Sequence, residues 1–211
     1  MMKLLFFLIV ASLRKSVEST CEEGWDELPR KHIDPSIKNF TVCLKWFNYT
    51  WTFDPKTNVA DNSPPENCRQ LDAYLGSISS QEDIAWAKKQ SNEGPVITSG
   101  TKVEKCPKKI DKSIPECSDL KTMFKWADPF TNTDILVQSN FCSGEPNGLM
   151  NPPEACLQLY KNNGNFCFND FPCLNASAEL KFDGDWNRIW RQEIKGYFCV
   201  KQSMEFLGAD E

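Results

Sequence analysis

The sequence has only one histidine, His32, among its 211 residues. No serine or cysteine nucleophile motif accompanies it, so the composition argues against nucleophilic and acid–base enzymes. Positive charge is also scarce, because 24 Lys and Arg face 29 Asp and Glu and leave a formal net charge of −5. An acidic chain is a poor partner for nucleic acid or for an anionic membrane, and neither is expected to bind.

Long apolar segments and repeats are missing as well. Beyond the N-terminal segment, no apolar run is long enough to cross a bilayer, so no membrane insertion is expected. The chain shows no internal repeat and no collagen-like or heptad pattern. An oligomer is possible, but the sequence contains no stalk that would build one.

The N-terminal segment has the pattern of a secretory signal. Lys3 precedes an apolar run of ten residues over 4–13, which suits a signal peptide and is too short for a membrane span. Cleavage is expected after Ser19, with Ser12 as the alternative. Residues 1–19 are therefore predicted to be a signal peptide, and the mature chain is predicted to be secreted into the extracellular space.

Cysteines and glycosylation sequons support the same compartment. Ten cysteines in a secreted chain indicate five disulfides rather than metal ligands. Three Asn-x-Ser/Thr sequons, at Asn39, Asn48 and Asn175, are candidate glycosylation sites.

Local patterns predict two helices followed by strands. Apolar side chains recur three to four residues apart over Pro65–Leu75, as on one face of a helix. Ser79–Glu82 has the capping-box pattern that starts a second helix, and Gly94-Pro95 is expected to end it. Strands are predicted at Phe40–Leu44, Val96–Ile97, Met123–Trp126, Cys156–Tyr160, Asn165–Asn169 and Gly196–Val200, the fourth and fifth of them forming a hairpin.

A lysine- and proline-rich stretch over 102–121 interrupts these elements. It contains Cys106 and Cys117, so we interpret it as a surface insertion closed by its own disulfide. A solvated loop is the favoured reading, and a basic binding patch is the alternative.

Several segments, in this order and spacing, resemble the long form of the C-type lectin-like domain. They are Cys21–Trp25, Cys68, Leu75–Ile78, Phe124–Asp128, Gly144–Asn147, Glu154–Cys156, Phe168–Cys173 and Tyr197–Cys199. The resemblance implies an α+β C-type lectin-like fold, with two helices flanking small antiparallel sheets and a long loop region that carries a calcium site. The domain would span residues 20–201, followed by a polar tail over 202–211.

The resemblance also implies most of the disulfide pairing. It implies the pairs Cys21–Cys43, Cys68–Cys199 and Cys156–Cys173. Four cysteines remain: a Cys106–Cys117 bridge within one loop leaves Cys142–Cys167 as the fifth pair.

The resemblance further implies a calcium-dependent sugar site. Its oxygen ligands to Ca²⁺ would be Glu145, Asn147, Glu154, Asn169 and Asp170. Calcium takes six to eight oxygen ligands, so places remain for two neighbouring sugar hydroxyls. By resemblance, Glu145 and Glu154 would accept hydrogen bonds from the sugar while Asn147 and Asn169 donate to it.

The order of acid and amide in Glu145-Pro146-Asn147 carries the expected specificity. By resemblance, this order goes with mannose, N-acetylglucosamine, glucose and fucose, and the inverted Gln-Pro-Asp goes with galactose. The family has a cis peptide bond at the position of Pro146. The expected partners are therefore glycans with mannose-type terminal sugars.

Some residues depart from the family pattern. Phe168 stands where a tryptophan is usual, and Gly148 and Ala155 replace acids, so an auxiliary calcium site is not expected. In the long segment after Cys173, Trp186 and Trp190 are core residues in the favoured reading and sugar-stacking residues in the alternative. The alternative function is a calcium-independent protein-binding module of the same fold.

Overall fold

The fold was analysed in a computed structural model. It describes residues 21–31, 39–50, 64–91, 93–106, 111, 113–129, 131, 140–147, 154–162, 164–173 and 193–203. Among these residues, no helix has both the length and the apolar character needed to cross a membrane. The predicted signal peptide and the polar tail lie outside the described residues.

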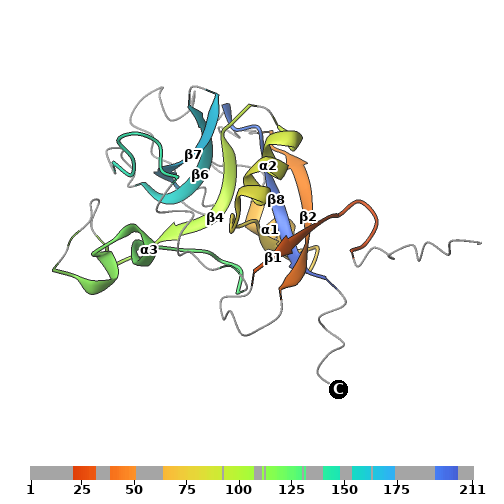
Figure 1. Ribbon diagram of the computed structural model, residues 1–211, viewed down its shortest axis with the longest axis horizontal. Helices are drawn as coiled ribbons and strands as arrows, with labels where there is room; N and C mark the ends of the chain where they lie inside the picture. Colours follow the sequence, from red (N-terminus) through yellow and green to blue (C-terminus); the bar gives the residue numbers. More distant parts are fainter. Residues whose placement is uncertain are drawn as a thin grey trace, which may run out of the picture.

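One mixed sheet organises the described part of the chain (Figure 1). Its strands are β1 (Asp26–Arg30), β2 (Phe40–Asn48), β3 (Tyr74–Leu75), β4 (Val96–Lys102), β5 (Phe124–Lys125), β6 (Glu154–Asn162), β7 (Asn165–Pro172) and β8 (Gly196–Gln202). The main order is β1-β2-β8-β4-β6-β7, with β3 beside β8 and β5 beside β4. Only β4 and β8 pair in parallel among these strands. The predicted α+β class is confirmed, although the strands join into one sheet.

The first helix is shorter than its sequence pattern predicts. Helix α1 spans Pro64–Arg69, whereas the prediction extended it to Leu75. After Arg69 the chain turns, because Asp72 adopts a left-handed φ of 50° and the Ala73 amide donates to the Cys68 carbonyl at 3.0 Å. Leu75 then pairs with Cys199 in β8. Sheet pairing therefore overrides the helical periodicity here.

The second helix starts one residue later than predicted and ends earlier. Helix α2 spans Gln81–Gln90, with Ser80 as its N-cap. The capping box joins Ser80 to Asp83 rather than Ser79 to Glu82, with the Asp83 amide donating to the Ser80 hydroxyl at 3.2 Å. Both capping boxes fit the sequence, and the burial of Asp83 selects the observed one.

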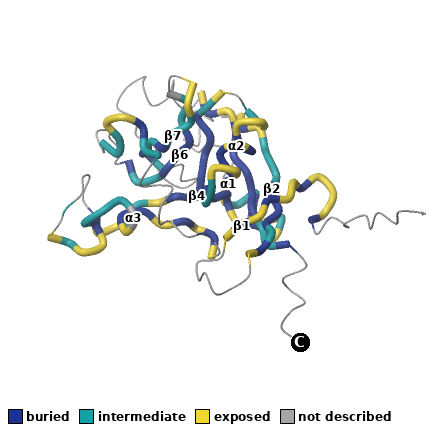
Figure 2. The backbone as a smooth tube through the Cα atoms, in the orientation of Figure 1, coloured by how far each residue is buried: buried dark blue, intermediate teal, exposed yellow. Residues whose placement is uncertain are grey.

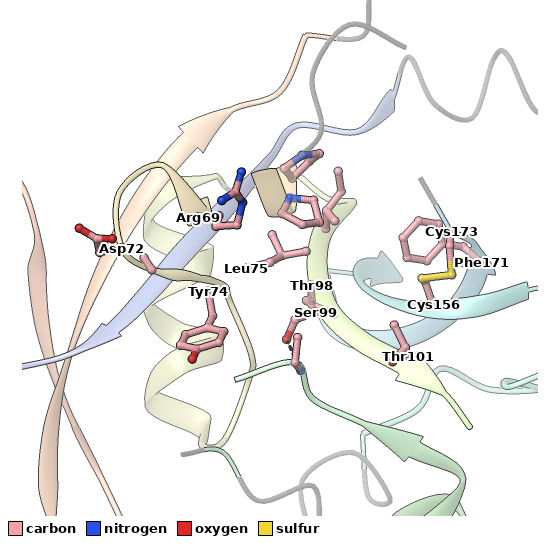
Figure 3. Close-up of a pocket in the computed structure, with 15 residues that line it drawn as sticks. Arg69, Asp72, Tyr74, Leu75, Thr98, Ser99, Thr101, Cys156, Phe171 and Cys173 are labelled. Atoms are coloured by element: carbon pink, nitrogen blue, oxygen red, sulfur yellow. Dashed lines mark hydrogen bonds between the residues drawn. A yellow bond between two sulfur atoms is a disulfide. The ribbon is translucent and has the colours of Figure 1, made fainter. Parts of the chain in front are cut away.

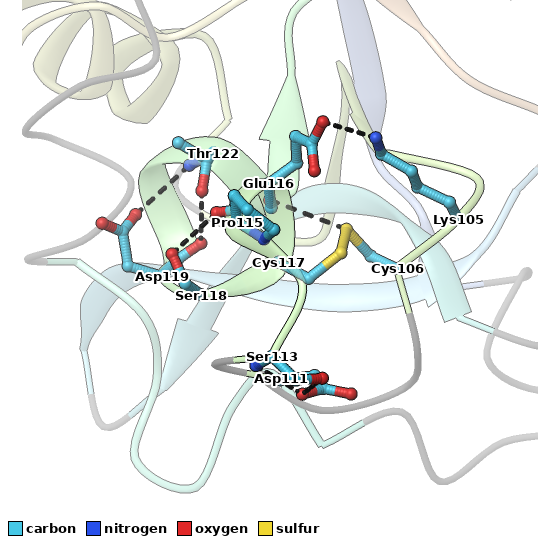
Figure 4. The surroundings of a disulfide bond; sticks show 10 residues. All are labelled: Lys105, Cys106, Asp111, Ser113, Pro115, Glu116, Cys117, Ser118, Asp119 and Thr122. Atoms are coloured by element: carbon cyan, nitrogen blue, oxygen red, sulfur yellow. Dashed lines mark hydrogen bonds and ion pairs between the residues drawn. A yellow bond between two sulfur atoms is a disulfide. The ribbon is translucent and has the colours of Figure 1, made fainter.

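The lysine-rich insertion forms a projection beside the end of β4 (Figure 1). It contains the 3₁₀ turn η1 (Pro115–Cys117) and the short helix α3 (Leu120–Met123). Figure 4 shows the Cys106–Cys117 disulfide that closes it, together with an ion pair from Lys105 to Glu116 at 2.5 Å. Helix α3 takes Met123 out of the predicted strand, so β5 contains only Phe124 and Lys125.

The apolar core lies on both sides of the sheet, and the central strands β4 and β8 are the most deeply buried (Figure 2). One cluster packs α2 against the sheet through residues such as Trp86 and Phe198. The second gathers around Leu75, Ile97 and Phe171. Both faces of the β6–β7 hairpin therefore meet apolar groups near its middle.

The described residues contain five disulfides. They are Cys21–Cys43, Cys68–Cys199, Cys106–Cys117, Cys142–Cys167 and Cys156–Cys173. These are the expected pairs, and no described cysteine is free. Five disulfides are typical of a protein that folds in an oxidising compartment.

Gly76 is a position where the fold leaves no room for a side chain. A Cβ there would lie 2.0 Å from the Phe198 ring, and the backbone is held by bonds to Phe198 and Ser99 of 2.7 and 2.8 Å. We expect Gly76→Ala to lower the free energy of unfolding by about 1–3 kcal/mol through overpacking, measured by urea denaturation. The loss should shrink in a Phe198→Leu background, and an equal loss in both backgrounds would contradict this explanation.

Candidate functional site

The segment carrying Glu145 is anchored on strand β7. The Cys142–Cys167 disulfide ties the two covalently, with their Cα atoms 5.0 Å apart. Phe141 forms a parallel bridge with Phe168. The Phe168 amide donates to the Asn140 carbonyl at 2.7 Å, and the Cys142 amide donates to the Phe168 carbonyl at 2.9 Å. This segment therefore follows β7 along its edge, toward Asn169 and Asp170.

A tight turn then directs Glu145 at the end of β7. The Glu145 amide donates to the Cys142 carbonyl at 2.9 Å, and Gly144 takes a φ of +90°, which favours glycine. The Glu145–Pro146 peptide bond is cis, as the family resemblance implies.

Asn147 connects the two acidic side chains of this region. Its backbone amide donates to Glu145 Oε2 at 3.0 Å and to Asp170 Oδ1 at 3.1 Å. Its side-chain Nδ2 donates to Glu145 Oε1 at 2.8 Å. The structure therefore brings together three of the five predicted site residues: Glu145, Asn147 and Asp170.

The other two predicted residues lie on the β6–β7 hairpin close to this group. Asn169 precedes Asp170 in β7, and its Oδ1 is buried with no hydrogen-bond partner among the described residues. Glu154 begins β6, is 4% exposed, and pairs with Pro172. A buried amide oxygen without a donor is an acceptor available to a cation.

The acidic side chains of the site disfavour each other's charge. The pKa of Glu145 is raised to about 7, first by desolvation, then by a hydrogen bond and repulsion from Asp170, with a further contribution from Glu154. The backbone amide of Asn147 acts in the opposite direction. A divalent cation would relieve this repulsion.

The residues present fit a mixed set of calcium ligands. Within the described ranges, no three side chains of His, Cys, Asp or Glu stand close enough together to hold a metal ion. Calcium does not require three such side chains, because it accepts amide oxygens as well as carboxylates. Glu145 and Asp170 are in contact, and Asn169, the residue before Asp170, adds a buried amide oxygen, so the three side chains supply oxygens of the kinds that calcium accepts.

Phe168 keeps the anchoring role that a larger ring has in the family pattern. It is fully buried, and its ring lies 6.0 Å from Trp126 and 6.1 Å from Phe141, centroid to centroid. These contacts hold the strand directly before Asn169 and Asp170. The smaller ring thus still packs on the core.

Gln158 is a polar residue of this region that the sequence pattern did not single out. It alternates with Leu157 and Leu159, which predicts a solvent-facing side chain. Instead it is fully buried opposite Asn169, and both of its amide atoms lack partners among the described residues. Only the packing of the second face of the hairpin reveals this burial.

The predicted glycosylation sites are partly described. Asn39 and Asn48 are exposed, and the Asn48 side-chain oxygen accepts a bond from the Trp46 indole at 2.9 Å. Asn175, Trp186 and Trp190 lie outside the described residues, as do Gly148 and His32.

The fold and disulfide pattern are those of a C-type lectin-like domain. Residues 38–191 match the family described as C-type lectin domain-containing protein 141/158, and the chain belongs to that family. Its domains are binding domains rather than enzymes. No curated protein matches the chain.

Solved structures with the same fold share little sequence with this chain. A calcium-independent type II antifreeze protein is 18% identical, covering 87% of this chain and 95% of its own, with a TM-score of 0.48. The carbohydrate-recognition domain of cow CD23, crystallised in the presence of a GlcNAc2Man3 oligosaccharide, is 19% identical over 87% and 97%, with a TM-score of 0.46. The mouse scavenger receptor C-type lectin domain is 20% identical over 87% and 97%, with a TM-score of 0.43.

Proposed function

We propose that this chain is a secreted protein that binds mannose-type sugars in a calcium-dependent manner. The ligands to Ca²⁺ are Glu145, Asn147, Glu154, Asn169 and Asp170. The observation that carries the proposal is the joint contact of Asn147 with Glu145 and Asp170; Asn169, the residue before Asp170, adds a buried oxygen that has no partner among the described residues.

The side chains of the site suit sugar hydroxyls. When bound, a calcium ion supplies open coordination places for two neighbouring hydroxyls. Asn147 Nδ2 now donates to Glu145 Oε1 at 2.8 Å, so a donor and an acceptor already face each other. A hydroxyl between them accepts from Asn147 and donates to Glu145, and we assign the donor and acceptor roles toward its neighbour to Asn169 and Glu154.

The rest of the proposal follows from the same residues. The five disulfides fit a secreted protein, and Asn39 and Asn48 are exposed sequons open to glycosylation. The carboxylates serve as ligands, and the chain is not an enzyme. A single shallow sugar site binds weakly, so useful avidity requires several sugars on one ligand or several copies of the chain.

The primary test is binding of the oxidised, purified protein to immobilised mannose. We expect retention in millimolar calcium and release by a chelator, because the sugar is held through the ion. Failure to bind in calcium overturns the proposal. Binding of a protein partner that persists in chelator, without sugar binding, establishes the calcium-independent alternative instead.

Exchanging the acid and the amide tests the assigned specificity. We expect Glu145→Gln combined with Asn147→Asp to shift the preference from mannose to galactose, measured by competition with the two free sugars on beads carrying both. The exchange keeps the number of carboxylates and amides, so calcium should still protect the variant against thermal unfolding. An unchanged sugar preference in a calcium-binding variant contradicts the residue assignment.

A further inference from the structure

A cavity of about 640 Å³ lies between the α1–β3 region and the β4–β6–β7 part of the sheet (Figure 3). Leu75 and Ile97 contribute apolar walls, and Phe171 and the Cys156–Cys173 disulfide close the opposite side. The volume lies within the range of small-molecule binding sites, about 300–1,000 Å³.

The described lining is apolar inside and carries its charged residues at its exposed rim. Its charged residues are Arg69 and Asp72, and the Arg69 guanidinium is held by Glu66 through bonds of 2.9 and 2.7 Å. Figure 3 places Arg69 and Asp72 together at the side away from the disulfide. Because Glu66 already pairs with the one cation of the described lining, the cavity offers no free counter-charge to a fatty acid carboxylate, and it favours a neutral ligand.

A buried hydroxyl of the lining, that of Ser99, is able to donate to a ligand. Thr98 Oγ1 already donates to the Leu157 carbonyl at 2.7 Å. Ser99, which is 3% exposed, accepts from the Ala127 amide at 3.4 Å, so its own proton is left for an acceptor. The cavity therefore suits a neutral, largely apolar molecule with an oxygen acceptor, such as an ether or ester.

The cavity and the proposed sugar site are lined by neighbouring residues at the same ends of β6 and β7. Phe171 directly follows Asp170, and Cys156 lies two residues after Glu154, about 7 Å along the strand at the usual rise. Neighbouring residues of a strand point to opposite faces of the sheet. A ligand that reaches both the cavity and the sugar site must therefore pass around the end of the hairpin, beside the Cys156–Cys173 disulfide. A flexible chain attached to a sugar meets this requirement.

We infer that the cavity holds the apolar aglycone of a neutral glycolipid whose sugar occupies the calcium site. The inference rests on the proposed function and names its ligand class. The sugar supplies orientation, and the apolar chain supplies the affinity that a single shallow sugar site lacks.

The test compares methyl α-mannoside with octyl α-mannoside below its micelle concentration, by calorimetry in calcium. We expect the octyl compound to bind about tenfold more tightly or better, because its chain leaves water. Ala127→Trp should remove this gain while leaving methyl mannoside binding unchanged, since Ala127 is exposed and lines the cavity. Thr122→Trp, an exposed change on α3 away from the lining, is the matched control and should keep the gain.

A neutral fluorophore, N-phenyl-1-naphthylamine, reports on the cavity without sugar. Its fluorescence should rise with the wild type in chelator and not with Ala127→Trp. Three outcomes would overturn the inference and leave the sugar site standing. They are equal affinity of the two mannosides, a gain in affinity that survives Ala127→Trp, and a cavity that excludes the fluorophore because another part of the chain fills it. Absence of methyl mannoside binding in calcium overturns the proposed function, and the glycolipid assignment with it.

Discussion

Glu145→Gln is expected to weaken calcium binding by about a hundredfold or more and to abolish retention on mannose. The substitution removes one carboxylate of the contacting Glu145–Asp170 pair and leaves an amide oxygen that accepts one of the two hydrogen bonds from Asn147. Calcium titration by calorimetry measures the effect. A calcium affinity within a few-fold of the wild type would show that Glu145 is not a ligand.

The calcium-free variant is expected to be at least as stable as the wild type, which separates a site effect from misfolding. The pKa of Glu145 is raised to about 7, mainly by desolvation, so this group stabilises the fold at low pH. That contribution is lost as pH rises from its ordinary pKa near 4.5 through about 7. In chelator, the stability of Glu145→Gln relative to wild type should therefore increase from pH 5 to pH 8. A variant that is less stable at pH 8 would contradict this account.

Calcium should then reverse the order of stability. An ion that binds only the folded state raises the free energy of unfolding by about 2.7 kcal/mol at a hundred times its Kd. The wild type gains this protection and Glu145→Gln does not. The acids of the site thus repel each other in the calcium-free protein, and the same acids attract the ion when calcium binds.

The parts of the fold that the sequence predicts well depend on local patterns and on cysteine order. The β6–β7 hairpin follows from alternation on both sides of a short turn, and it appears close to the predicted limits. Three of the disulfide pairs follow from the resemblance, Cys106–Cys117 follows from its position within one loop, and Cys142–Cys167 is the pair that then remains. Strand β8, predicted over Gly196–Val200, extends by two residues.

The features that the sequence does not predict depend on contacts between distant residues. Leu75 leaves the helical pattern because β8 offers it a partner at Cys199, more than a hundred residues away. Gln158 is buried because a second apolar cluster covers the face that its alternation assigns to solvent. The site follows the same rule, since the Phe141–Phe168 bridge and the Cys142–Cys167 disulfide bring the segment of Glu145 to the strand that carries Asp170.

A second distant contact joins the start of the domain to its middle. Arg30, at the end of β1, is 2% exposed, and its guanidinium donates to the Ser77 hydroxyl at 3.0 Å, the Ser77 carbonyl at 2.9 Å and the Thr131 hydroxyl. Asp83 lies 3.3 Å from it and Asp128 lies 4.0 Å from it, and both carboxylates are buried. The Arg30 cation faces both acids, and it links β1, α2 and the segment after β5.

Arg30→Met is expected to lower the free energy of unfolding by about 3–5 kcal/mol, because it keeps much of the side-chain volume but leaves two buried acids without their cation. Urea denaturation of the oxidised protein measures the loss. Adding Asp128→Asn should recover part of it by removing one of the two buried negative charges, whereas Asp83 must stay because it caps α2. If the double variant is as unstable as Arg30→Met alone, the loss comes from the hydrogen bonds to Ser77 and Thr131 rather than from charge.

This cluster is distant in sequence from Glu145–Asn147. Any Arg30→Met protein that remains folded should therefore bind calcium as the wild type does. A matched loss of calcium affinity would reveal a coupling between the Arg30 cluster and the calcium site.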